Sequence, residues 1–63
     1  MLTILITPTM ITFKNLTDEM QEKLNKEYPL ELNKKGEIAI RGDEVKLYKA
    51  LLKLSYTYDI EIV

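Results

Sequence analysis

The segment from Asp43 to Tyr58 (DEVKLYKALLKLSYTY) constrains the fold of this chain more than any other. At about 3.6 residues per turn, its apolar side chains would cover more than half of the circumference of a helix. They are Leu47, Tyr48, Ala50, Leu51, Leu52, Leu54 and Tyr58, with Val45 and Tyr56 at one edge. One sheet can cover only part of so wide an arc. We therefore expect the rest to contact a second helix, another copy of the chain or a different protein.

The 63 residues make a single domain, residues 1–63, at the lower end of independent stability. A domain of this size buries only about 60% of its unfolded surface, and small domains commonly gain stability from disulfides, a metal ion or oligomerisation. Cysteine and histidine are both absent, which removes disulfides, thiolate ligands and the commonest zinc ligand. Oligomerisation or partner binding is therefore the stabilising device that we expect.

The same two absences limit the enzymatic chemistry open to the chain, which would have to use Lys, Tyr, Asp and Glu alone. Ser–His and Cys–His pairs cannot form, and the single serine, Ser55, lies within the apolar helix. Acidic residues gather where helices are expected to begin, a position that the helix dipole favours, and they lack the spacing of a calcium loop. These are Asp18, Glu19, Glu22, Asp43 and Glu44. We expect no enzyme activity, no cofactor, no metal ion and no small-molecule substrate.

Charge and hydropathy predict a cytoplasmic protein without a membrane segment. The net charge is -1, which argues against a general nucleic-acid binder. No apolar run approaches the roughly 18 residues of a membrane span. The N-terminal MLTILITPTMITF has no basic region before it and is interrupted by threonines, which favours strands over a signal peptide.

Alternating apolar residues, helix caps and turn residues predict seven elements. In order, they are strands at Met1–Thr7 and Met10–Phe13, a helix at Thr17–Tyr28, strands at Leu30–Leu32 and Glu37–Ile40, a helix at Asp43–Tyr58 and a strand at Asp59–Val63. The first two strands form either a hairpin around Pro8-Thr9 or one bent edge strand. The predicted fold is α+β, in the order β(β)αββαβ. It is an antiparallel or mixed sheet with two helices on one face and the split βαβ pattern of ferredoxin-like or KH-like folds.

Residues 30 to 54 (LELNKKGEIAIRGDEVKLYKALLKL) carry a family resemblance. With the preceding helix, segment 17–54 resembles the α-β-β-α core of KH-like modules, as in the segment that precedes the ATPase domain of PhoH-type proteins. The resemblance implies a KH-like fold and nucleic-acid binding. The GxxG loop by which KH domains hold nucleotides is missing, because Gly36 and Gly42 are isolated. No Walker A motif is present, so no ATPase activity is implied.

Two surfaces are candidate binding sites. Protein-interface candidates on the long helix are Leu47, Leu51, Leu54, Tyr48, Tyr56 and Tyr58, since leucine excess and tyrosine clusters are typical of interfaces. Candidate phosphate contacts are Lys46, Lys49 and Lys53, with Arg41, although such a lysine stripe is also the ordinary solvated face of a helix.

The function that these patterns favour is that of a small non-enzymatic protein-binding module, expected as a homodimer. It would dock its Leu/Tyr helix face, or an open sheet edge such as Met1–Thr7, onto a protein partner. In length, lack of cysteine and composition, the chain resembles accessory proteins of phages and mobile elements, many of which inhibit or regulate a host protein by occluding its surface. The alternatives are a KH-like nucleic-acid-binding regulator that uses the lysine stripe, and a structural unit that assembles through its β-edges.

Overall fold

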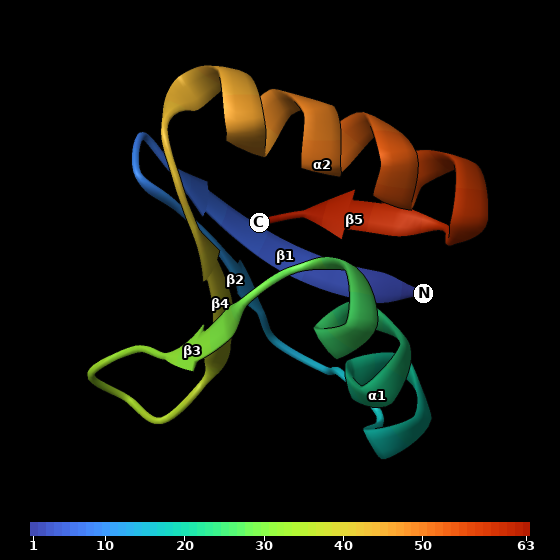
Figure 1. The fold of residues 1–63 in the computed structure, drawn as a ribbon. Coiled ribbons are helices and arrows are strands. Elements are labelled where there is room, and N and C mark those ends of the chain that lie inside the picture. The colour runs from blue at the N-terminus through green and yellow to red at the C-terminus, as the bar shows by residue number, and fades with distance from the viewer.

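A computed structural model describes all 63 residues of the chain. Its elements are β1 (Leu2–Thr7), β2 (Met10–Phe13), α1 (Asp18–Glu27), β3 (Leu30–Leu32), β4 (Ile38–Arg41), α2 (Glu44–Thr57) and β5 (Ile60–Ile62). The strands form one sheet and the helices pack against it, with α2 lying over β1 and β5 (Figure 1). Neither helix has the length and apolar composition needed to cross a bilayer.

The strand order in the sheet is β3-β4-β2-β1-β5. Neighbouring strands are antiparallel except β1 and β5, which are parallel. Each helix therefore connects two parallel strands that are separated by other strands: α1 joins β2 to β3, and α2 joins β4 to β5. This confirms the predicted α+β fold with a mixed sheet and a split βαβ pattern.

The first two strands form a hairpin, one of the two predicted alternatives. Thr7 pairs with Met10, so Pro8 and Thr9 make the connection. Proline fits there because it has no N–H to contribute to the ladder. The prediction that Met1–Thr7 is an edge strand of the sheet is wrong, because β1 lies between β2 and β5 in the strand order, with β5 paired to Leu2, Thr3 and Ile4.

Both helices begin at side-chain caps that the sequence predicts. The Thr17 hydroxyl accepts a hydrogen bond from the Met20 N–H at 3.2 Å, and the Asp43 carboxylate accepts one from the Lys46 N–H at 2.8 Å. Each cap satisfies a backbone donor that the first turn of a helix leaves unpaired. At the other end of α1, Tyr28 is in an extended conformation, as the following Pro29 favours.

The core lies between the sheet and the two helices. Strand alternation directs one set of apolar side chains toward the helices, where they meet the inner faces of α1 and α2. The buried cluster consists of Leu2, Ile4, Ile11, Phe13, Leu24, Ile40, Leu47, Ala50 and Leu54. The opposite face of the sheet carries no helix, and its charged residues are therefore free to pair with one another.

Candidate protein-binding surface

The sheet buries only part of the apolar arc of α2. Leu47, Ala50 and Leu54 are buried, whereas Tyr48 remains 61% exposed and Leu52 39% exposed. This confirms the prediction that the arc is too wide for one sheet. Leu47 and Leu54, both interface candidates from the sequence, belong to the core at 5% and 3% exposure. They fill the center of the helix face that meets β1, β2 and β4.

The uncovered flank of α2 faces the edge strand β5. Between them lies a shallow apolar depression of about 290 Å³, which we call the α2–β5 groove. Its lining residues are Tyr48, Leu51, Leu52, Ser55, Ile60 and Ile62. Three of the exposed large apolar side chains, Tyr48, Leu52 and Ile62, line this groove, and exposed Val63 directly follows β5. Such a concentration on a small domain is typical of a binding surface.

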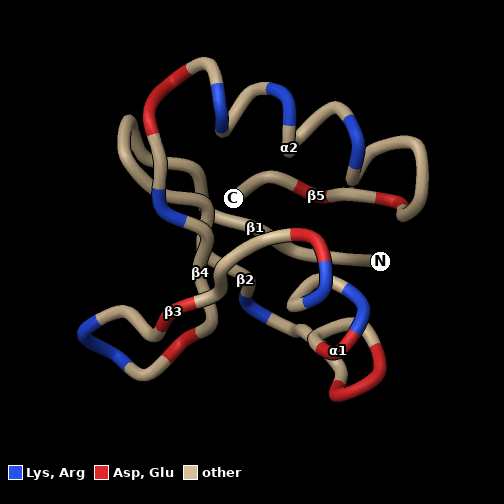
Figure 2. Tube along the Cα trace, viewed as in Figure 1, with Lys and Arg blue, Asp and Glu red and all other residues tan.

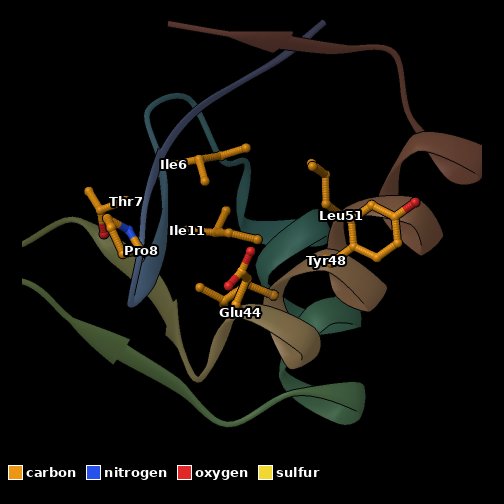
Figure 3. Close-up of a pocket in the computed structure, with 8 residues that line it drawn as sticks. Ile6, Thr7, Pro8, Ile11, Glu44, Tyr48 and Leu51 are labelled. Carbon is orange, nitrogen blue, oxygen red and sulfur yellow. The ribbon is translucent and has the colours of Figure 1, made fainter.

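A second depression, which we call the hairpin pocket, adjoins the groove. It measures about 520 Å³ and lies between the β1–β2 hairpin and the first half of α2. In Figure 3, Ile6 and Ile11 face Leu51 and Tyr48 across the pocket, with the Glu44 carboxylate at its margin. Tyr48 and Leu51 line both depressions, so the pocket and the groove form one continuous apolar surface.

The strand β5 is an open edge of the sheet. The Leu2 N–H donates to the Asp59 carbonyl at 2.7 Å, and the Val63 N–H donates to the Ile4 carbonyl at 2.9 Å. Because backbone groups alternate in direction along a strand, the N–H and C=O groups of Ile60 and Ile62 point away from β1. They lie at the rim of the groove and are available to another strand.

The structure places the remaining interface candidates in different surroundings. Tyr58 packs against the core, whereas Tyr56 is 85% exposed on the outer side of α2 and lines neither depression. Leu51 lines both depressions as a partly buried residue. The predicted candidates that line the two depressions are therefore Tyr48 and Leu51, with the largely buried Leu47 in the wall of the hairpin pocket. The sequence set missed Leu52, Ile62 and Ile6, because their exposure depends on which strand becomes the edge.

The four basic candidates do not form one patch. Alternation along β4 places Arg41 on the helix-free face of the sheet, where it pairs with Glu31, whereas the lysines lie on α2. Lys53 pairs with Glu27 of α1 at 3.2 Å, and Lys46 and Lys49 form no ion pair. Figure 2 shows the basic bands of α2 well apart from those of the β3–β4 turn.

The helix-free face of the sheet is organised by local ion pairs. Lys14 Nζ contacts the Glu37 carboxylate at 3.0 Å, and the Asn33 amide donates to the same carboxylate at 3.1 Å. The Asn33 hydrogen bond, followed by the Lys14 interactions, lowers the pKa of Glu37 below its ordinary value of 4.5. Asn33 also accepts from the N–H groups of Lys35 and Glu37, so this network holds the β3–β4 turn, whose Gly36 has φ +81°.

No three acidic side chains are grouped so that they could hold a metal ion. No family model, curated protein or solved structure matches the chain. Its function is therefore inferred from its own surfaces.

Proposed function

We propose that this chain is a small non-enzymatic protein-binding module that works through the α2–β5 groove and the adjoining hairpin pocket. The observation that carries the proposal is the continuous apolar surface shared by the two depressions, with Tyr48 and Leu52 exposed at its center. Exposed tyrosine beside aliphatic side chains is a frequent composition of interface centers. The module acts in the cytoplasm by covering a working surface of its partner.

The proposed partner class follows from size and composition. A domain of 63 residues can inhibit or regulate a larger host protein by occlusion, as accessory proteins of phages and mobile elements do. Self-association into a homodimer through the same surface would also cover the exposed apolar side chains, and it stays a prediction. Both versions place the same residues at the contact.

Site-specific photocrosslinking tests this proposal directly. A benzophenone amino acid replaces Tyr48 in one variant and Glu22, an exposed residue of α1, in a matched control. We expect adducts in the source cell from position 48 and few from position 22. Adduct mass separates the two versions, because a homodimer gives twice the chain mass and a host partner gives another value. Equal adduct yields from both positions would contradict the proposal.

Substitutions at two adjacent residues of α2 distinguish the core from the proposed binding surface. Leu47 is 5% exposed and Tyr48 is 61% exposed. We expect Leu47→Glu to unfold the domain, because it places an unpaired carboxylate in the core. We expect Tyr48→Glu to keep the fold, to lower the unfolding free energy by less than about 1 kcal/mol and to abolish partner binding. Circular dichroism with urea titration measures the first effect, and crosslinking from position 52 measures the second. A folded Tyr48→Glu variant that keeps its partner would exclude Tyr48 from the interface.

A KH-like nucleic-acid-binding regulator is the second candidate. Its support is a groove of about 320 Å³ between the two helices, which is lined by Lys23, Lys26 and Lys53 among others. Lysines around a groove can contact phosphates without reading bases. Fluorescence titration with single-stranded RNA at low and high salt tests it: binding that weakens steeply with salt would support it. No binding at low salt would remove it.

A further inference from the structure

We propose that β5 binds one strand of a partner protein as a sixth strand of the sheet, and that this strand alternates apolar and basic residues. This inference rests on the proposed function and specifies the partner's chemistry. Strand addition to an open edge takes its affinity from backbone hydrogen bonds and its specificity from side chains on the two faces. Each of these three contributions has a counterpart at β5.

The backbone contribution comes from Ile60 and Ile62. Their N–H and C=O groups point away from β1, as the bonds of Asp59 and Val63 to β1 require. The strand is three residues long, so it offers pairing to a short segment only. A short segment suits a specific partner and limits aggregation through the same edge.

On the side of β5 that faces the helices, the neighbouring side chains favour apolar residues in the added strand. An added strand would place every second side chain on the same face as Ile60 and Ile62. On that face lies the α2–β5 groove, where Tyr48 and Leu52 stand above the strand edge. An apolar side chain entering the groove would cover these exposed groups, and the hairpin pocket adjoins the groove at Tyr48 and Leu51.

On the helix-free face of the sheet, Glu61 favours basic residues in the added strand. Glu61 lies on the helix-free face, next to Thr3 of β1 in the register, and is exposed. None of the four ion pairs in the structure includes Glu61, and none includes Glu44 at the margin of the hairpin pocket. A lysine or arginine of the added strand, placed across from Glu61, would form a cross-strand ion pair.

The same charge disfavours a second copy of β5 as the occupant. Antiparallel self-pairing that sets Ile60 against Ile62 of the second copy also sets Glu61 against Glu61. Moving the register by two residues in one direction sets Glu61 against Asp59 instead. Like charges directly opposite each other destabilise a strand pair. The charge pattern therefore fits a basic, non-identical strand better than self-pairing through this edge.

Peptide binding to the whole chain tests the proposal. The probe is a fluorescein-labelled peptide with the core Val-Lys-Ile-Lys-Val, and its controls are the glutamate analogue and a scrambled core, Val-Val-Ile-Lys-Lys. We expect fluorescence anisotropy to show at least about threefold tighter binding of the alternating basic peptide than of either control, the scale of a few cross-strand pair energies. Equal affinity for the alternating and scrambled peptides would overturn the proposal, because it would show charge attraction without strand pairing.

A charge reversal at the edge identifies the site. Glu61→Lys should reverse the preference, so that the glutamate analogue binds more tightly than the lysine peptide. Glu22→Lys, on α1, makes the same change in net charge at a distance and should leave the preference unchanged. A reversal in both variants would overturn the proposal. If no peptide binds while crosslinks still form from position 48, the strand proposal fails and the proposed protein-binding function remains.

Discussion

The two edges of the sheet have the same sequence pattern and different surroundings. At one edge β3 reads Leu-Glu-Leu, and at the other β5 reads Ile-Glu-Ile. In both, the central glutamate lies on the helix-free face and the first apolar side chain, Leu30 or Ile60, packs against the core. Glu31 of β3 pairs with Arg41 of the neighbouring strand, whereas Glu61 of β5 has Thr3 as its neighbour and no ion pair.

The apolar surroundings of the two edges differ as well. α2 lines an apolar groove alongside β5, whereas the depression that includes Leu32 of β3 is lined mainly by polar and charged residues. Pro29 directly precedes β3 and has no N–H to offer an added strand. The comparison shows that the surroundings of an edge strand distinguish β5 from β3, since local sequence makes the two strands nearly equivalent. It also yields predictions that separate the two edges.

The largest expected effect is a loss of stability, and we expect it to be similar at both edges of the sheet. Ile4 lies beside Ile62 of β5, and Ile40 lies beside Leu30 of β3; both interior isoleucines are fully buried. We expect Ile4→Ala and Ile40→Ala each to lower the free energy of unfolding by about 2–5 kcal/mol, because each leaves a cavity in the core. That loss is enough to unfold most of a domain this small.

Urea denaturation of the two variants measures these losses. The control is Leu32→Ala, because Leu32 is 64% exposed and its truncation leaves no cavity. A loss for Leu32→Ala as large as those of the isoleucine variants would show that the β3 edge is covered in solution.

An intermediate effect is expected from two substitutions that exchange the charge environments of β3 and β5. Thr3→Lys places an ammonium group beside Glu61, which makes β5 resemble β3. We expect it to weaken binding of the alternating basic peptide about threefold, because the glutamate then has a partner of its own. Arg41→Gln frees Glu31 and makes β3 resemble β5 in charge.

Peptide stoichiometry then tells which feature selects the edge. We expect Arg41→Gln to keep one peptide per chain, since the depression beside β3 is lined mainly by polar and charged residues. Two peptides per chain in titration calorimetry would show that charge alone selects the edge. The Arg41–Glu31 pair is exposed, so the substitution should change the unfolding free energy by no more than about 1 kcal/mol.

The smallest effect concerns pH and the turn that follows β3. Because the pKa of Glu37 is lowered in the fold, its carboxylate stabilises the folded state above the ordinary value of 4.5, and this contribution is lost as pH falls through the lowered pKa. We expect Glu37→Gln to lower stability at neutral pH and to flatten the decline in acid. Urea midpoints between neutral and acidic pH measure this, with Glu22→Gln as control. Identical acid profiles for the wild-type chain and Glu37→Gln would contradict the lowered pKa.

Much of the fold could be predicted because its signals are local. Thr17 and Asp43 start the helices through hydrogen bonds to residues three positions away, and Pro29 lies just beyond the end of α1. The layout of the candidate binding surface could be predicted less fully. Tyr48 and Leu51 lie on it, but Leu47 and Leu54 lie in the core, and Leu52 was missed. Helical periodicity gives the width of an apolar arc without showing which part a sheet will cover.

The sequence by itself determined the order of the elements, the caps and turns that bound them, and an apolar arc on α2 wider than one sheet can cover. The tertiary structure decided the rest: which residues of that arc are buried, that β5 rather than β1 lies at the edge, and that Glu31 has a cation beside it while Glu61 does not. The physical reason is the distance along the chain over which each interaction acts. Caps and periodicity act within a few residues, whereas strand order and register bring together residues far apart in the chain, and only their pairing fixes the neighbours of each edge.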